Sequence, residues 1–249
     1  MPAYGFMMAT GIIFAGAMAL RRVKQFGLSP EDVLITMSCA LGLGFLGGSI
    51  VYSGVTYSWK EILQLLQAGN MTALLGGGLV FYGSLVGGFG GTWLGCWIAK
   101  ASLSDVILCI LPSIPLAHTF GRIGCFLAGC CYGVSTDLCI GVKFFAPIAG
   151  TPVGIALIPV QLIEAVLNLS LFAFLLWHTT CQHDAWSSLF LYTGFYSAFR
   201  FLLEFWRGDS IRGIWGGIST SQWISLALIL VTGAHLIWRR MWRGCCEKD

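Results

Sequence analysis

Long apolar runs dominate this 249-residue chain. About seven runs of roughly 17–25 residues, the length that crosses a bilayer core, follow one another with short polar segments between them. They cover residues 3–20, 33–55, 71–99, 106–126, 160–177, 186–206 and 222–238. Only 10% of the residues are charged, whereas a soluble domain carries about 25%. The sequence therefore predicts an all-α integral membrane protein of about seven transmembrane helices, and it carries no basic block that would indicate nucleic-acid binding.

Two of these runs contain residues that interrupt helices. The run 71–99 is rich in glycine, including Gly-Gly-Gly at 76–78, and the run 106–126 contains Pro112 and Pro115. Non-helical backbone at membrane depth persists only where protein or a water-filled cavity satisfies its polar groups. We therefore expect a functional site near these two spans.

The distribution of Lys and Arg predicts the orientation of the chain. If the N-terminus lies outside, eight basic residues fall in inner loops and the C-terminal tail, and four fall in outer segments. Because Lys and Arg are retained on the cytoplasmic side, the count favours an outer N-terminus and a cytoplasmic C-terminus. This topology places residues 118–133, 81–83 and 200–209 toward the outer half of the membrane, where one cavity would collect them.

The remaining segments are connections within a single polytopic domain, residues 1–249. Residues 59–67 have one apolar and one polar face, which is typical of a short helix lying in the outer interface. Residues 139–159 form the longest outer connection.

Two arginines lie within apolar runs. Arg122 stands between Gly121 and Gly124, and Arg200 precedes Glu204 by four residues, so this pair shares one helix face. A charge inside a membrane is costly and indicates an anionic partner or a cavity. The alternatives are an arginine that snorkels to the interface for Arg122 and a structural ion pair for Arg200.

Polar residues also begin the fifth and seventh runs. Gln161 and Glu164 follow Pro159, and we interpret Glu164 as a carboxylate that complements the helix dipole in the first turn rather than as a catalytic group. Gln222 follows Ser-Thr-Ser at 219–221, an ordinary N-cap pattern.

Three of the ten cysteines gather after Arg122, at Cys125, Cys130 and Cys131, with His118 upstream. Three interpretations stay open: packing or a static disulfide, a redox-active or nucleophilic thiol, and a metal site. On a continuous helix Cys125 and Cys130 would point roughly 140° apart. We therefore predict a non-helical turn at residues 129–131, with at least one thiol beside Arg122.

Six segments, in order along the chain, resemble the prolipoprotein diacylglyceryl transferase family. They are Tyr-Gly-Phe-Met-Met from Tyr4, Phe-Tyr-Gly around Tyr82, Gly-Arg-Ile-Gly at 121–124 with the later Gly133, Pro-Val-Gln-Leu-Ile-Glu at 159–164, Arg200-x3-Glu204-Phe, and Gln-Trp-Ile-Ser at 222–225. The resemblance implies a bacterial multi-pass plasma-membrane enzyme without a cofactor or metal. Such an enzyme moves a diacylglyceryl group from phosphatidylglycerol to the lipobox cysteine of a preprolipoprotein.

The resemblance also implies roles for particular residues. Arg122, Arg200, Glu204 and Gly133 would bind the lipid phosphate, and Tyr4 and Tyr82 would be catalytic candidates, supported by Gln161 and Glu164. From this chain's own residues, His118, Cys125 and Cys130 are further catalytic candidates, and Cys131 would support them. The chain departs from the family where Cys125 and Cys130 replace an asparagine and a glutamate, and where Tyr82 replaces a histidine that is a candidate for proton transfer. Because tyrosine is a poor general base, His118 is a candidate substitute. A membrane thiol-redox or metal-handling protein, with Cys125, Cys130, Cys131 and His118 as working groups, is the alternative function.

Overall fold

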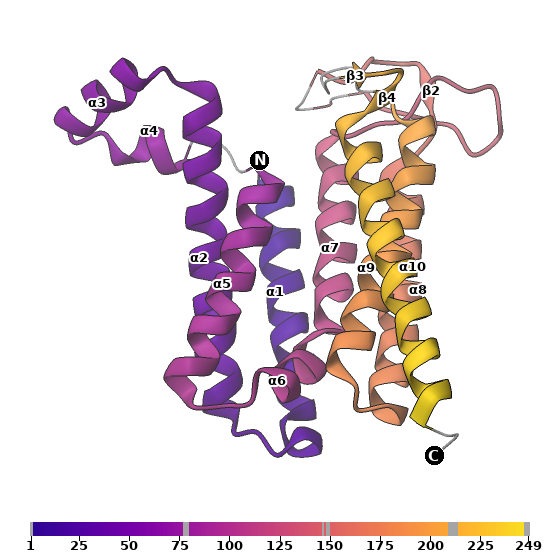
Figure 1. Cartoon of the computed structure of the whole chain (residues 1–249). Helices are drawn as coiled ribbons and strands as arrows, with labels where there is room; N and C mark the ends of the chain where they lie inside the picture. The colour runs from indigo at the N-terminus through magenta and orange to yellow at the C-terminus, as the bar shows by residue number, and fades with distance from the viewer. Residues whose placement is uncertain (1, 77–79, 146, 148–149, 209–213, 247–249) are drawn as a thin grey trace. The chain divides into compact units, whose positions relative to one another are not determined.

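The computed structural model describes residues 2–76, 80–145, 147, 150–208 and 214–246 (Figure 1). Its helices are α1 (Pro2–Arg22), α2 (Pro30–Thr56), α3 (Trp59–Gln67), α4 (Met71–Gly76), α5 (Phe81–Ala99), α6 (Leu103–Ile110), α7 (Ser113–Ala128), α8 (Val160–Cys181), α9 (Ala185–Leu203) and α10 (Thr220–Cys246), with 3-10 turns at Val23–Phe26 and Glu204–Trp206. Two short antiparallel hairpins pair β1 (Val142–Lys143) with β2 (Ala156–Leu157) and β3 (Ile214–Trp215) with β4 (Ile218–Ser219). The chain divides into two compact units, residues 19–106 and residues 1–18 with 107–249.

Within the described residues, five helical segments are long and apolar enough to cross a membrane. They are Ala3–Phe26, Pro30–Thr56, Leu103–Ala128, Val160–Cys181 and Thr220–Arg239. The predicted all-α, multi-pass membrane architecture is confirmed at this level. The expected spans 71–99 and 186–206 also contain long helices, α5 and α9, but these are not among the five. The count of seven and the orientation remain predictions.

In the unit of residues 19–106, α5 packs against α2 with backbone against backbone. Glycines recur every fourth residue on α5, at Gly83, Gly87, Gly91 and Gly95. A β-carbon on Gly91 would lie 2.7 Å from the Cα of Ala40, and one on Gly95 would lie 2.5 Å from the Cα of Thr36. Small residues at this spacing let two membrane helices approach closely.

The predicted interruption of the run 71–99 is present at Val80, which has an extended backbone and immediately precedes α5. Two serines of α2 satisfy the carbonyls at the end of α4: Ser53 donates to Leu74 O at 2.7 Å and Ser49 donates to Leu75 O at 3.0 Å. Side chains of α2 thus provide hydrogen-bond donors to backbone carbonyls of α4 close to the interruption.

The short helix predicted at 59–67 is also present, as α3. Ser58 accepts from the Glu61 N–H, and the Glu61 carboxylate accepts from the Ser58 N–H at 2.7 Å, which makes a capping box. No described residue of α3 is buried. Its position in the membrane interface remains a prediction.

In the other unit, α7, α8, α9 and α10 lie alongside one another (Figure 1). A buried leucine cluster joins Leu111, just before α7, to Leu171 and Leu175 of α8, and mostly aromatic side chains of α8 and α9 pack against it. The first part of α1 packs on α7, where the Phe14 and Phe120 rings stack with centroids 5.2 Å apart. This packing fixes the faces of α7, α8 and α9 that carry polar side chains.

The run 106–126 is interrupted only once. The break lies at Leu111–Pro112, between α6 and α7. The expectation that Pro115 also breaks the helix was wrong: Pro115 is the third residue of α7, where a backbone N–H would have had no helical partner in any case.

Candidate functional site

The centre of the candidate site is an ion pair between α7 and α8. Arg122 Nε lies 3.0 Å from Glu164 Oε1, and only 3% of the Glu164 side chain is exposed. The interpretation of Glu164 as a first-turn carboxylate was therefore wrong. Helix α8 begins at Val160, so Glu164 lies beyond its first turn, and its side chain is used as the counter-ion of Arg122.

Glu164 belongs to a buried polar stripe along α8. Gln161, Glu164 and Asn168 are each at most 2% exposed, and their spacing of three and four residues places them on one helix face. Among the described residues, Gln161 Oε1, Glu164 Oε2 and Asn168 Oδ1 have no hydrogen-bond donor. Buried acceptors of this kind are costly unless a ligand or water donates to them. The sequence analysis missed Asn168, although the three-four periodicity would have indicated it.

The second predicted ion pair is also formed. Arg200 Nη2 lies 2.7 Å from Glu204 Oε2, and the same nitrogen donates to Ser221 Oγ of α10 at 3.4 Å. The start of α10 is fixed by a reciprocal cap, in which Gln222 Oε1 accepts from the Ser219 N–H at 2.9 Å and Ser219 Oγ accepts from the Gln222 N–H at 3.2 Å. The predicted N-cap is confirmed, and it holds Ser221 beside Arg200.

An aromatic pair links the two arginines. The rings of His118 on α7 and Tyr196 on α9 have centroids 5.3 Å apart. The charges of Arg122, Glu164 and Arg200 act on both rings. The structure thus brings His118, Arg122 and Arg200 into one polar region between α7, α8 and α9.

The predicted turn after α7 is present. Gly129 ends the helix in the left-handed conformation, with φ +70°, and the Cys130 N–H donates to Cys125 O at 3.0 Å. This is the usual glycine termination of a helix. Cys131 is also left-handed, with φ +58°, which is rare for a residue with a side chain.

Side chains from the following segments hold this turn in place. Gln161 Nε2 donates to Cys130 O at 2.6 Å, and Thr151 Oγ1 donates to Gly129 O. The predicted supporting role of Gln161 thus has a specific contact: it connects the polar stripe of α8 to the cysteine turn.

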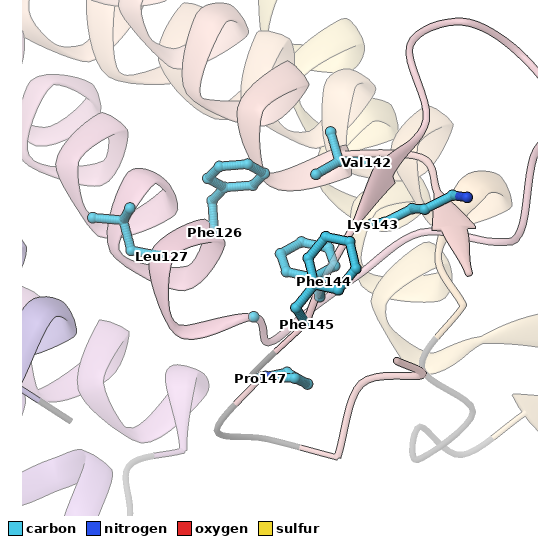
Figure 2. A pocket seen from close by; sticks show the side chains of 8 residues that line it. Phe126, Leu127, Val142, Lys143, Phe144, Phe145 and Pro147 are labelled. Carbon is cyan, nitrogen blue, oxygen red and sulfur yellow. The ribbon is translucent and has the colours of Figure 1, made fainter. Parts of the chain in front are cut away.

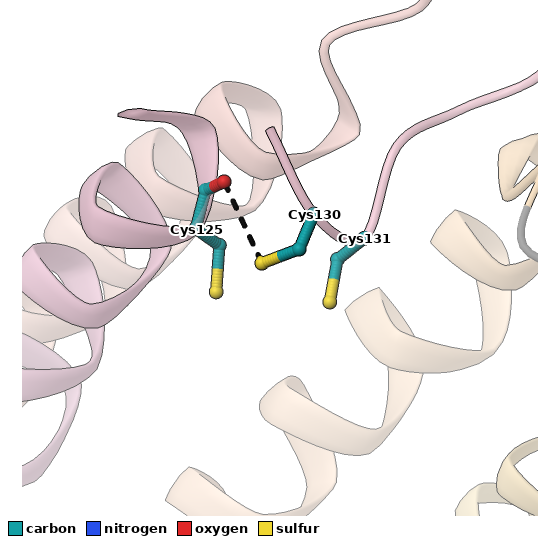
Figure 3. Close-up of side chains that lie close together, drawn as sticks. All are labelled: Cys125, Cys130 and Cys131. Atoms are coloured by element: carbon teal, nitrogen blue, oxygen red, sulfur yellow. Dashed lines mark hydrogen bonds between the residues drawn. The ribbon is translucent and has the colours of Figure 1, made fainter. Parts of the chain in front are cut away.

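The turn brings three sulfur atoms together (Figure 3). The Sγ atoms of Cys125, Cys130 and Cys131 lie within 4.8 Å of one another and are partly buried. Cys130 Sγ also lies 3.6 Å from Cys125 O. Hydrogen bonds from the thiols of Cys125 and Cys130, together with the charge of Arg207, lower the pKa of Cys131. Among the described residues, His118 does not join this group of sulfurs.

Beyond the cysteines, Gly133 lies in a seam of backbone hydrogen bonds. Its N–H donates to Ile158 O at 3.1 Å, and the Gly208 N–H donates to Tyr132 O at 3.0 Å. A β-carbon on Gly133 would lie 2.5 Å from Ile158 O. Gly133 is therefore required for the close approach of three segments, and its predicted contact with a lipid phosphate remains a prediction.

Of the two tyrosines that are catalytic candidates, Tyr4 has described contacts and Tyr82 does not. Tyr4 packs against α7 one residue before Cys125, since a β-carbon on Gly124 would lie 3.2 Å from the Tyr4 ring. Tyr82 lies in α5 of the other unit, and its side chain is outside the described residues.

A shallow hollow of about 290 Å³ adjoins the cysteine turn (Figure 2). Apolar side chains from the end of α7 and from the segment 142–147 line most of it, and Lys143 supplies a charge. Gly129 lines the same hollow, so it opens beside the turn that carries the thiols.

Comparison with known proteins decides the family. The sequence model of the prolipoprotein diacylglyceryl transferase family matches residues 1–238. The chain belongs to this family. It is 35% identical over 227 residues to phosphatidylglycerol–prolipoprotein diacylglyceryl transferase 2 of Clostridium perfringens, covering 91% of this chain and 86% of the relative. It is 36% identical to the corresponding transferase of Clostridium tetani, with 92% and 89% covered, and 29% identical to that of Dehalococcoides mccartyi, with 99% and 92% covered.

The predicted family is therefore confirmed. In this member of the prolipoprotein diacylglyceryl transferase family, the same unit contains two buried arginines, a stripe of buried oxygens that have no donor among the described residues, and a cluster of three thiols. The first two features suit a polar lipid headgroup, because cations pair with phosphate and buried acceptors pair with hydroxyls.

Proposed function

We propose that this chain transfers a diacylglyceryl group from phosphatidylglycerol to a prolipoprotein, as the names of its relatives state for them, and that the acceptor is the lipobox cysteine. One observation carries the proposal: Arg122 and Arg200, from different helices, are both largely buried and both act on His118 and Tyr196. Two buried guanidinium groups in one membrane-embedded polar region are suited to a phosphodiester.

The proposed chemistry matches the charges in this region. The bond between the diacylglyceryl carbon and a phosphate oxygen breaks, and glycerol phosphate leaves with the electron pair. Arg122 and Arg200 would stabilise the negative charge that develops on it, which is most effective where water is excluded. The unpaired oxygens of Gln161, Glu164 and Asn168 would accept hydrogen bonds from the hydroxyl groups of the lipid's glycerol headgroup.

The proposal includes a location and an orientation. We propose that the protein lies in the bacterial plasma membrane with its N-terminus outside and its C-terminus in the cytoplasm. The eight-to-four distribution of Lys and Arg supports this orientation. The cysteine turn would then face the side of the membrane on which an exported acceptor arrives.

The alternative function, a thiol-redox or metal-handling protein, is supported by the three sulfur atoms within 4.8 Å of one another. The two functions predict different sensitive residues. Transfer of a lipid requires the arginines, whereas metal handling or redox chemistry alone requires the cysteines.

The test is complementation of a transferase-depleted bacterium, with lipoprotein modification read out by mass spectrometry. The parent should restore modification, and Arg122→Ala and Arg200→Ala should each reduce it roughly 10–150-fold, because each loses a charge-assisted contact worth about 1.5–3 kcal/mol. Lys60→Ala, which removes an exposed cation of α3, is the control. Full modification by both arginine variants, inserted at parental levels, would contradict the proposal.

A further inference from the structure

The three thiols have the spacing of a metal site. Zinc–sulfur bonds are about 2.3 Å long, so the sulfurs around one zinc ion lie about 3.8–4.0 Å apart. The Sγ atoms of Cys125, Cys130 and Cys131 already lie within 4.8 Å of one another. Small side-chain rotations are therefore enough to bring the three sulfurs to the spacing that zinc requires. Thiolates also select soft or borderline ions such as zinc over magnesium or calcium.

The backbone enforces this convergence. Two left-handed residues, Gly129 and Cys131, turn the chain back toward the last turn of α7. A non-glycine residue in that conformation is strained and persists only where its surroundings impose it. Gln161 and Thr151 supply that constraint through the carbonyls of Cys130 and Gly129. Strain held in place by neighbouring segments is typical of functional sites.

Positive charges flank the cluster. The charge of Arg122 acts on Cys125 and Cys131, and the charge of Arg207 acts on Cys131. Three thiolates around one zinc ion would carry a net charge of about −1, and the charge of Arg207 beside Cys131 would offset it. Among the described residues, no His, Asp or Glu joins the three sulfurs as a fourth ligand.

We propose that Cys125, Cys130 and Cys131 bind one zinc ion through their thiolates and leave its fourth position open to the thiol of the acceptor. Three protein ligands and one open position are the usual arrangement of a catalytic zinc, whereas structural zinc has four protein ligands. The evidence for zinc binding is the geometry of the three sulfurs. The binding of the acceptor thiol at the open position rests on the proposed transferase function.

The site would activate the acceptor thiol without a general base. When the acceptor thiol binds zinc, its proton passes to solvent, because a coordinating thiol is deprotonated. The acceptor sulfur then forms the bond to the diacylglyceryl carbon as the carbon–oxygen bond breaks, and glycerol phosphate takes the electron pair. Zinc changes no oxidation state, so no oxidant or reductant is needed. This route does not require a base at Tyr82.

The metal is tested on the purified full chain. Elemental analysis should find about one zinc per chain, and cobalt(II) added in place of zinc should give thiolate-to-metal charge-transfer absorption. Cys125→Ser, Cys130→Ser and Cys131→Ser should each lose most of the zinc. Cys139→Ser, an exposed cysteine outside the cluster, should keep it. Parent protein without zinc, with copper instead, or with a disulfide between two of the three thiols would overturn the proposal.

Further measurements separate the metal site from the transferase function. Removing zinc with a chelator should abolish modification of a lipobox peptide in phosphatidylglycerol vesicles, and added zinc should restore it. A chain that modifies the peptide equally well without zinc overturns the open-position proposal and leaves the transferase function intact. A chain that binds zinc but modifies no peptide has the metal site without that function. If a cysteine variant fails to insert into the membrane, the cobalt spectrum of the parent protein still shows whether thiolates bind the metal.

Discussion

Arg122 on α7 and Glu164 on α8 form a buried ion pair, with 3.0 Å between Nε and Oε1. Neither side chain can be removed alone without leaving the opposite charge in a largely dehydrated place. This pair is therefore a structural contact between two helices as well as part of the proposed lipid site. Its contribution to stability and its contribution to lipid transfer can be measured separately.

We expect Glu164→Ala to destabilise the protein by roughly 3–5 kcal/mol, the usual cost of leaving one member of a buried pair. The double variant Arg122→Met/Glu164→Leu should recover most of that stability but should not modify lipoproteins. Thermal unfolding in detergent and mass spectrometry of an acceptor measure the two effects. A double variant that remains active would show that the pair is structural only.

Gly133→Ala should destabilise the seam between residues 132–134, 156–158 and 206–208 by about 1–3 kcal/mol, because its methyl group meets the Ile158 carbonyl. Gly16→Ala is the matched control: a β-carbon there has no atom within 4 Å, and alanine favours a helix by up to about 1 kcal/mol. Equal melting temperatures for the two variants would refute the assignment of Gly133 to a packing role.

The contact between α2 and α5 provides a third test. Gly87→Val should prevent close packing and lower the yield of folded protein, because a β-carbon at Gly87 would meet the backbone of Leu43 and Gly44. Gly90→Val lies on the same helix, where a β-carbon has no neighbour within 4 Å, and should be tolerated within about 0.5 kcal/mol. Gel filtration and thermal unfolding in detergent compare the two, and equal loss would contradict the packing described.

The proposed orientation predicts the behaviour of reporter fusions. Reporters placed after Arg22 and near Arg239 should be active in the cytoplasm, and one at Lys143 should be active outside. Cysteine-accessibility labelling from the outer side provides an independent readout at the same positions. A cytoplasmic reporter signal at Lys143 would reverse the orientation, and the acceptor would then meet the cysteine turn from the wrong side.

The sequence predicted contacts that lie within one helix or one turn. Arg200 and Glu204 are four residues apart, so helical periodicity alone brings them together. A turn at residues 129–131 was predicted because Cys125 and Cys130 would point apart on a continuous helix, and Gly129 ends α7 there in the left-handed conformation that glycine adopts readily. These features depend on local geometry, and the structure confirms both.

Contacts between helices could not be derived in this way. The pairing of Arg122 with Glu164 depends on which face of α8 packs against α7, and the proline before α8 favoured a dipole role for Glu164 instead. The periodicity of Gln161, Glu164 and Asn168 indicated a buried face, but not its partner. The meeting of three thiols likewise required the left-handed Cys131, which no residue preference predicts.

The glycine contact between α2 and α5 also limits how this chain can diverge. A large residue in a side-chain interface can be accommodated when its neighbour becomes smaller. Here the neighbours of Gly87 and Gly91 are the backbones of Leu43 and Cys39, which no substitution can shrink. Relatives that keep this helix pair must therefore retain small residues on both sides of it, and sequence change in the pair is confined to the faces that point away from the contact.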